Sequence, residues 1–232
     1  MTQGMPGFIF LMGVLDMTKK AIIFIDANNW YHNVKKYFKP SKIDITKVSN
    51  LIAKEKGLKI LDIRWFVSVP SIADGEAMYY KHMSFLSHLR KQNIKVITRK
   101  LQRLSNNELK KKRQKFIESW DLCKLCKPIV EESFLDIADH QKKEKGIDVW
   151  IAIDMVKETI LKNIDCVVLI SGDADFVPAF DLIKEFKKEV LSASVPSGYS
   201  RELREKFPSF ILGKEKLIKC LKDYKTIKGE EE

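Results

Sequence analysis

Two periodicities of hydrophobic and polar positions alternate along this chain. Short continuous apolar runs rich in β-branched residues predict buried strands at 21–25, 60–69, 94–98, 166–170 and 190–195, with a shorter strand at 210–212. Stretches with apolar residues at helical spacing, or with helix start and stop signals, predict helices between them, at 30–38, 43–55, 74–92, 148–162, 178–186, 199–207 and 214–224. Strands that alternate with helices predict an α/β fold with a mostly parallel sheet and helices on both faces.

Two of the predicted strands end in acidic residues. Asp26 follows the run 21–25, and Ser171-Gly172-Asp173-Ala174-Asp175 follows the run 166–170. Asp148 stands at the start of the helix that leads into the second of these strands. Parallel sheets place ligands outside the carboxyl ends of their strands, and clustered carboxylates there repel one another unless a cation is bound. The pattern therefore indicates a site for Mg²⁺ or Mn²⁺, which prefer oxygen ligands and can activate water for attack on phosphorus.

Each acid taken alone has a simpler structural interpretation. Asp148 suits a helix N-cap, Asp175 could cap the helix near Pro178, and Asp173 could form an Asx turn. The coincidence of Asp26 with Asp173 and Asp175 at two strand ends favours the metal site. Asp154 is a weaker candidate, because six residues separate it from Asp148, which is about 120° around a helix.

Three segments in the same order resemble NYN domains of the LabA-like group, which are relatives of the PIN-like nucleases. Ile25-Asp26-Ala27-Asn28-Asn29-Trp30-Tyr31 resembles their opening DGxN segment, and Lys145-Gly146-Ile147-Asp148-Val149 their KGVDV segment. Leu169 to Pro178, read as LISGDADFVP, resembles their SGDxDFxP signature. The likeness covers about residues 18–212. Ala27 replaces the usual glycine, and Asn28 beside Asn29 leaves open which asparagine matches.

The resemblance implies a PIN-like Rossmannoid fold and metal-dependent cleavage of RNA. It implies that Asp26, Asp148, Asp173 and Asp175 are the catalytic acids and metal ligands. Asn29 and Ser171 would orient a carboxylate, a water or a phosphate, and Asp154 would support the site. The alternative function is a non-catalytic RNA-binding regulatory module that retains the acidic pocket. Haloacid-dehalogenase-like phosphatases fit poorly, because they need an Asp where this chain has Asn28.

The composition adds a preference for a polyanionic partner. The 232-residue chain has a net charge of +11 and a sequence pI near 9.3, which favours nucleic acid as a partner. Between positions 99 and 115 eight basic residues face one acid, Glu108. We expect these eight to contact RNA rather than form only a solvated helix face: Arg99, Lys100, Arg103, Lys110, Lys111, Lys112, Arg113 and Lys115.

A cysteine pair lies within the same region. Cys123 and Cys126 have zinc-knuckle spacing, but one CxxC supplies two ligands and a structural zinc site needs four. His140, Cys220 or the same pair from a second copy of the chain could complete it. Without such partners, two reduced thiols in a turn are the expected state.

The composition and ends of the chain complete the predicted organisation. We expect an N-terminal extension over 1–17, an NYN-type domain over 18–225 with a basic insertion at 99–130, and an acidic tail over 226–232. No apolar stretch reaches the roughly 20 residues of a membrane span. Four cysteines without a secretory signal favour the cytoplasm. A homodimer is left open.

Overall fold

A computed structural model describes residues 18–72, 75–100, 102–103, 106–139, 142–143 and 146–222. The predicted N-terminal extension and acidic tail lie outside these residues. Within them, no helix is both long enough and apolar enough to cross a membrane.

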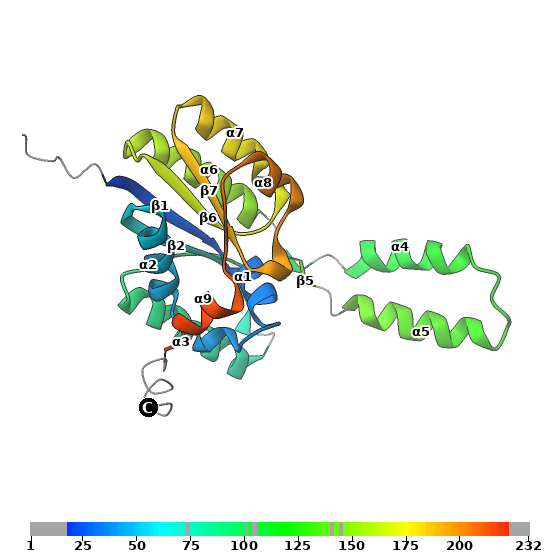
Figure 1. Cartoon of the computed structure of the whole chain (residues 1–232). Helices are drawn as coiled ribbons and strands as arrows, with labels where there is room; N and C mark the ends of the chain where they lie inside the picture. The colour runs from blue at the N-terminus through cyan, green and yellow to red at the C-terminus, as the bar shows by residue number, and fades with distance from the viewer. Residues whose placement is uncertain are drawn as a thin grey trace, which may run out of the picture.

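A six-stranded sheet forms the centre of the molecule, and all its strand pairs are parallel (Figure 1). The strand order is β3-β2-β1-β6-β7-β8. The chain runs outward from β1 to β3 and then returns to the centre at β6, so the order reverses between β1 and β6. The predicted α/β fold is confirmed, with strands β1 (Lys19–Asp26), β2 (Leu58–Val69), β3 (Lys95–Lys100), β6 (Cys166–Ile170), β7 (Glu189–Ser194) and β8 (Ser209–Ile211).

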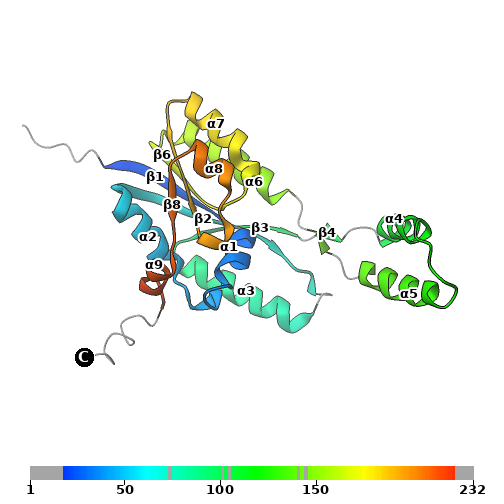
Figure 2. The same cartoon turned by 45° about the vertical axis from the view of Figure 1, so that its right-hand side comes forward.

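Helices cover both faces of this sheet (Figures 1 and 2). One face packs against α1 (Ala27–Val34), α2 (Ile45–Lys56), α3 (Glu76–Lys91) and α9 (Lys214–Lys219), and the other against α6 (Ile147–Leu161), α7 (Val177–Glu185) and α8 (Arg201–Lys206). Among the described residues, short 3₁₀ turns connect these elements at η1 (Pro40–Lys42), η3 (Ala174–Phe176) and η4 (Pro196–Gly198).

Strand β1 divides its side chains between the two layers. Ile23 and Ile25 enter the core beneath α1 and α2, while Ile22 and Phe24 enter the core beneath α6 and α7. Successive side chains of a strand point to opposite faces, so a central strand covered on both sides must be apolar throughout. This burial explains why 21–25 is an uninterrupted hydrophobic run.

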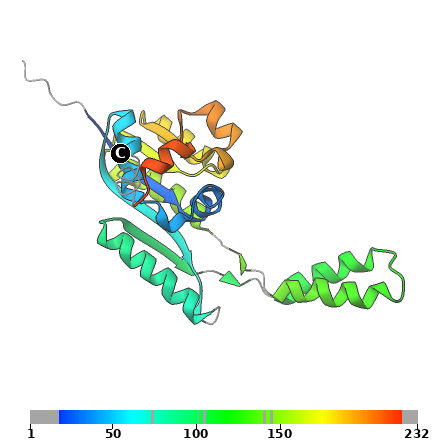
Figure 3. The same ribbon diagram turned by 60° about the horizontal axis from the view of Figure 1, so that its bottom comes forward.

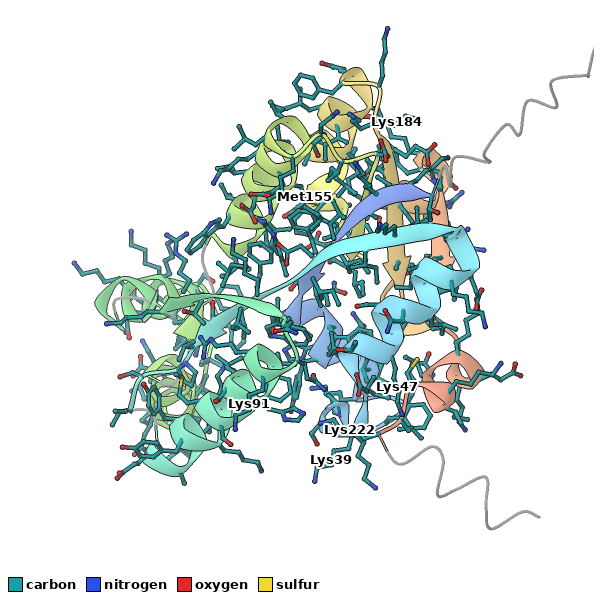
Figure 4. All side chains as sticks on the ribbon, turned by 90° about the vertical axis from the view of Figure 1, so that its left-hand side faces the viewer. Lys39, Lys47, Lys91, Met155, Lys184 and Lys222 are labelled. Carbon is teal, nitrogen blue, oxygen red and sulfur yellow. The ribbon has the colours of Figure 1, made fainter. Side chains whose placement is uncertain are left out.

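The C-terminal part of the described chain returns to α2. Lys47 donates from Nζ to the carbonyl oxygens of Leu221 at 2.6 Å and Lys222 at 3.4 Å, and Lys47 and Lys222 lie near each other in Figure 4. Ile43 and Leu221 form an isolated antiparallel bridge beside them. These contacts hold α9 against the same sheet face as α2.

A helical hairpin projects from this core as an arm (Figures 1 to 3). It consists of α4 (Asn106–Glu118) and α5 (Cys126–Asp139), which contact each other, and is rooted in the antiparallel pair β4 (Gln102–Arg103) and β5 (Lys142–Lys143). The arm therefore continues beyond the predicted limit at residue 130. The charge pattern missed its second helix because that helix is not basic. Phe116 and Trp120 lie on the arm with their rings 5.0 Å apart.

Candidate functional site

The acidic site predicted from the sequence forms around the ends of β1 and β6, where the strand order reverses. Ile25 pairs with Ile170 in the parallel register, so Asp26 and Ser171 leave neighbouring strands side by side. Open α/β sheets bind their ligands at such a switch point. The register alone therefore brings these two polar side chains to one place.

Hydrogen bonds from α1 and from Ser171 hold the buried carboxylate of Asp26. Its Oδ1 accepts from the backbone N–H groups of Asn28 and Asn29, both at 3.1 Å, which makes Asp26 the N-cap of α1. Its Oδ2 accepts from the hydroxyl of Ser171 at 3.1 Å. Only 4% of Asp26 is exposed, so this carboxylate has a fixed position at the edge of the sheet.

Ser171 also positions the loop that carries the other acids. Its hydroxyl oxygen accepts from the N–H of Asp173 at 3.3 Å, while its carbonyl oxygen accepts from the Ser192 hydroxyl at 3.2 Å. Asp173 caps the 3₁₀ turn η3, with Oδ1 accepting from the N–H of Asp175 at 3.0 Å. Asp175 itself is exposed and does not cap α7, whose N-cap is Phe176.

The structure distinguishes the two asparagines that the sequence left open. Asn29 accepts through Oδ1 from the N–H of Gly172 at 3.2 Å and from Nδ2 of Asn33 at 3.1 Å, whereas Asn28 is exposed. Asn29 therefore orients the backbone of the loop after β6. Helix α1 thus connects the acid at the end of β1 with the loop after β6, because Asp26 is its N-cap and Asn29 binds that loop.

Two glycines that the sequence reasoning did not assign to the site allow three segments to meet there. A Cβ atom on Gly172 would lie 1.5 Å from the carbonyl oxygen of Gly198, and one on Gly198 would lie 2.1 Å from the amide of Asn33. The hydroxyl of Ser197 donates to the Asn33 carbonyl oxygen at 3.2 Å. The Gly172 position lies within the acidic motif, and Pro196-Ser197-Gly198 follows a strand, so both signals were present in the sequence.

Asp148 and Asp154 lie on one helix but in different surroundings. Asp148 is the second residue of α6, partly buried, and α6 contacts η3 at the site. Gly146, with φ 74°, is the N-cap of that helix, so Asp148 does not have the capping role that the sequence also allowed. Asp154 lies farther along α6, with Oδ2 at 2.5 Å from Nη1 of Arg64. The structure therefore gives Asp154 a structural partner away from the strand ends.

The carboxylates have the right chemistry for a hard divalent cation, but the described side chains do not form a ready group of ligands. Asp26, Asp148 and Asp173 offer only oxygen donors, which Mg²⁺ and Mn²⁺ prefer. Among the side chains described, no group of three or more His, Cys, Asp or Glu residues could hold a metal ion. The metal site therefore stays a prediction.

The predicted basic residues lie along the arm and at its root. Lys100, Lys111, Lys112 and Lys115 are exposed and Arg113 is partly exposed, while the side chains of Arg103 and Lys110 lie outside the described part. Arg99 donates from Nη1 to the carbonyl oxygen of Gly146 at 3.1 Å and so joins the two chain segments at the root. Strand β3 ends there, at the same edge of the sheet as β1 and β6.

The cysteines fall into two environments. Cys123 and Cys126 are exposed at the end of the arm, where α5 begins. Cys166 and Cys220 are buried, and burial raises their pKa values to about 12 and about 11. The two buried thiols belong to the core and do not join the exposed pair.

Comparison with known proteins adds a family assignment to this geometry. The model of the NYN domain matches residues 20–213, which include β1 from its second residue, the acidic loop and the arm. No match was found among curated proteins, and none among solved structures. The matched range includes all three segments that resemble NYN domains, while the LabA-like subgroup stays a prediction. This chain belongs to the NYN domain family.

Proposed function

We propose that this protein is a ribonuclease that hydrolyses RNA phosphodiester bonds with Mg²⁺ or Mn²⁺. NYN domains are typically nuclease domains. The observation that carries the proposal is the hydrogen-bonded set formed by Asp26, Ser171 and Asp173 at the switch point of the sheet. The motifs further favour the LabA-like group, and the cysteine usage favours a cytoplasmic location.

The residues suited to hold the cation are Asp26, Asp148 and Asp173, with Asp175 at the rim. When bound, such an ion would activate water and offset the negative charge of the phosphate. The chain's own groups would fix the geometry around it. Ser171 would keep one oxygen of Asp26 in place, and Asn29 would keep the Asp173 loop against α1, as hydrogen bonds to the ligands do in metal sites.

RNA fits the charge distribution around this edge of the sheet. A polyanion approaching carboxylates is repelled unless positive charge lies nearby. The root of the basic arm lies at the carboxyl edge, and the exposed lysines of α4 extend outward from it. We propose that the arm binds the RNA backbone while the scissile phosphate lies at the strand ends.

The direct test compares RNA cleavage by wild type, Asp26→Asn and Asp173→Asn with Mg²⁺ or Mn²⁺. Asparagine also caps helices well, so Asp26→Asn removes the charge while retaining the cap of α1. We expect each variant to cleave single-stranded RNA about 10²-fold more slowly or worse, the size of effect expected for a catalytic proton-transfer group. Chelation should stop wild-type cleavage, and added Mg²⁺ or Mn²⁺ should restore it.

Asp181→Asn is the matched control. Asp181 lies on α7 in an exposed pair with Lys206 at 2.5 Å, so its loss removes a carboxylate outside the site. This variant should cleave at the wild-type rate. Wild-type rates for Asp26→Asn and Asp173→Asn, with unfolding midpoints unchanged, would contradict the catalytic assignment.

A non-catalytic RNA-binding module is the second candidate. It is favoured by one observation: the described residues contain no ready group of three metal-ligating side chains. It predicts salt-dependent RNA binding by wild type, no cleavage with either cation, and no heat of Mn²⁺ binding in calorimetry. Cleavage that depends on Asp173 would exclude it.

A further inference from the structure

The end of the arm carries two exposed thiols that the proposed nuclease reaction does not use. Cys123 precedes α5 and Cys126 is its first residue. The carbonyl oxygen of Cys123 accepts from the N–H groups of Cys126 and Lys127 at 3.1 and 3.0 Å, so the chain turns sharply at this point. The turn brings the two thiols of the motif together at the point farthest from the core (Figures 1 and 3).

The turn also orders the backbone around the first of these sulfurs. The N–H of Cys126 donates to Sγ of Cys123 at 3.3 Å. Thiolates are the metal-binding form of cysteine, and zinc sites commonly use a C-x₂-C pair in such a turn.

The pair is nevertheless only half of a zinc site. A structural zinc ion takes four ligands, and no described group of three or more His, Cys, Asp or Glu residues includes these thiols. Cys166 and Cys220 are buried in the core. The far end of α5, after which His140 follows, lies about 20 Å from Cys126 at 1.5 Å per residue, and the core is farther still.

We infer that Cys123 and Cys126 of two copies of this chain together bind one zinc ion, which joins the two arms end to end. The same CxxC on each copy supplies two thiolates, so one ion receives four equivalent ligands. A two-fold axis through the ion makes this contact self-complementary and closed. The site does not depend on the nuclease activity, because neither cysteine lies near the strand ends.

The surface around the thiols fits a contact between two arms. Leu125 is 83% exposed and Ile129 is 65% exposed, and Phe116 and Trp120 lie about half exposed near the same end. Two arms that meet at their ends would cover part of this apolar surface. Four thiolates around Zn²⁺ leave a net charge of −2, and the flanking exposed Lys124 and Lys127 of both copies would offset it.

The test titrates zinc into the reduced, metal-free full-length protein and measures mass by light scattering. We expect a change from the 26.9 kDa chain to twice that mass, complete at one zinc per two chains. Cys123→Ser and Cys126→Ser should each abolish the change. Both side chains are exposed, so neither variant should alter the far-ultraviolet circular dichroism. Co²⁺ in place of zinc should give the visible spectrum of a tetrahedral four-thiolate site.

Two controls separate this inference from the rest of the molecule. Cys166→Ala removes a buried thiol and should leave the zinc-dependent doubling of mass unchanged. Asp173→Asn should also retain it, so that loss of nuclease activity and loss of the dimer are distinguishable. One zinc bound per chain at unchanged mass, no zinc binding, or zinc-dependent dimers of Cys123→Ser would each overturn the inference.

Discussion

At the scale of single residues, Asp26 connects the fold to the site. Asp26 is the last residue of β1 and the N-cap of α1, and its carboxylate accepts a hydrogen bond from Ser171. One side chain therefore connects a strand, a helix and the loop that carries the other acids. The sequence predicted a helix from Trp30. The helix begins at Ala27 instead, because the carboxylate binds the N–H groups that a turn would leave open. The same side chain thus caps a helix and is a ligand of the proposed metal site.

The close approach of Gly172 to Gly198 leads to a prediction about stability. Gly172→Ala would place Cβ 1.5 Å from the Gly198 carbonyl oxygen, which is backbone and cannot move alone. We expect the free energy of unfolding to fall by about 1–3 kcal/mol, the usual cost of overpacking, and the Asn29 contact with the loop to be disturbed. Urea denaturation measures the first effect, and RNA cleavage the second.

Gly213→Ala is the control for that substitution. Gly213 has φ −63°, and a Cβ atom there would meet no atom within 4 Å. Its substitution should change the free energy of unfolding by no more than about 0.5 kcal/mol. If the two variants were equally stable, the Gly172 loop would have to be looser than the structure shows.

At the scale of elements, Arg64 joins β2 to α6 through a buried ion-pair network. It is 1% exposed, and its guanidinium contacts Asp62 at 2.9 Å, Asp154 at 2.5 Å and Glu158 at 2.7 Å. Burial alone would lower the pKa of Arg64, but hydrogen bonds to Asp154 and Asp62 outweigh it and raise that pKa. Lys162 adds a second cation, 3.0 Å from Glu158. The network fixes the helix that carries Asp148.

Removal of that arginine should therefore destabilise the protein strongly. Arg64→Met retains much of the side-chain volume but leaves three carboxylates around a buried position, where Lys162 contacts Glu158 and Asp62. We expect the free energy of unfolding to fall by about 3–5 kcal/mol, as when one partner of a buried ion pair is removed. Thermal or urea unfolding, monitored by circular dichroism, measures the change.

The exposed pair of Lys19 and Glu189 provides the comparison. Each side chain is 51% exposed, so Lys19→Met should lower the free energy of unfolding far less than Arg64→Met does, because water screens exposed ion pairs. Similar losses for Arg64→Met and Lys19→Met would contradict the view that the Arg64 network stabilises the packing of α6 on β2.

Much of the fold and part of the site were predictable from the sequence, for identifiable reasons. The run 166–170 matches β6 residue for residue, because a strand buried on both faces is apolar throughout. The acids at the strand ends were also predictable, because each group directly follows such an apolar run. The ion pair of Asp154 with Arg64 was not predictable, because the two residues lie 90 positions apart in the chain and contacts of that range leave no local pattern. The glycine contact between residues 172 and 198 is hidden in the same way.

At the scale of the whole molecule, the arm changes how the basic charge is understood. The sequence showed a basic stretch but did not show that it is one helix of a hairpin. The second helix, α5, is acidic, so the charge pattern did not extend to it. The structure places exposed lysines along α4, away from the core that holds the acids. This placement of the exposed lysines supports the proposed contact with a long polyanion, because the charge extends along the arm.

This arrangement makes a quantitative prediction for RNA binding. Each phosphate contact made by a lysine adds about −0.7 to the slope of log affinity against log salt for a single strand. Lys111→Gln with Lys115→Gln should therefore reduce the magnitude of that slope by about 1.4 if both side chains contact phosphates. Fluorescence anisotropy with a labelled single-stranded RNA, measured across a salt series, gives the slope.

The matched control removes the same charge elsewhere. Lys54 lies on α2 and Lys59 near the amino end of β2, both exposed and away from the carboxyl edge. Their substitution by Gln lowers the net charge equally, so any effect of overall charge on RNA affinity would appear in both double variants. If the slope of log affinity against log salt is unchanged in the Lys54 and Lys59 double variant but smaller in the Lys111 and Lys115 double variant, the phosphate contacts belong to the arm. Equal changes in both pairs would instead mean that RNA responds to net charge and that the arm has no special part in binding.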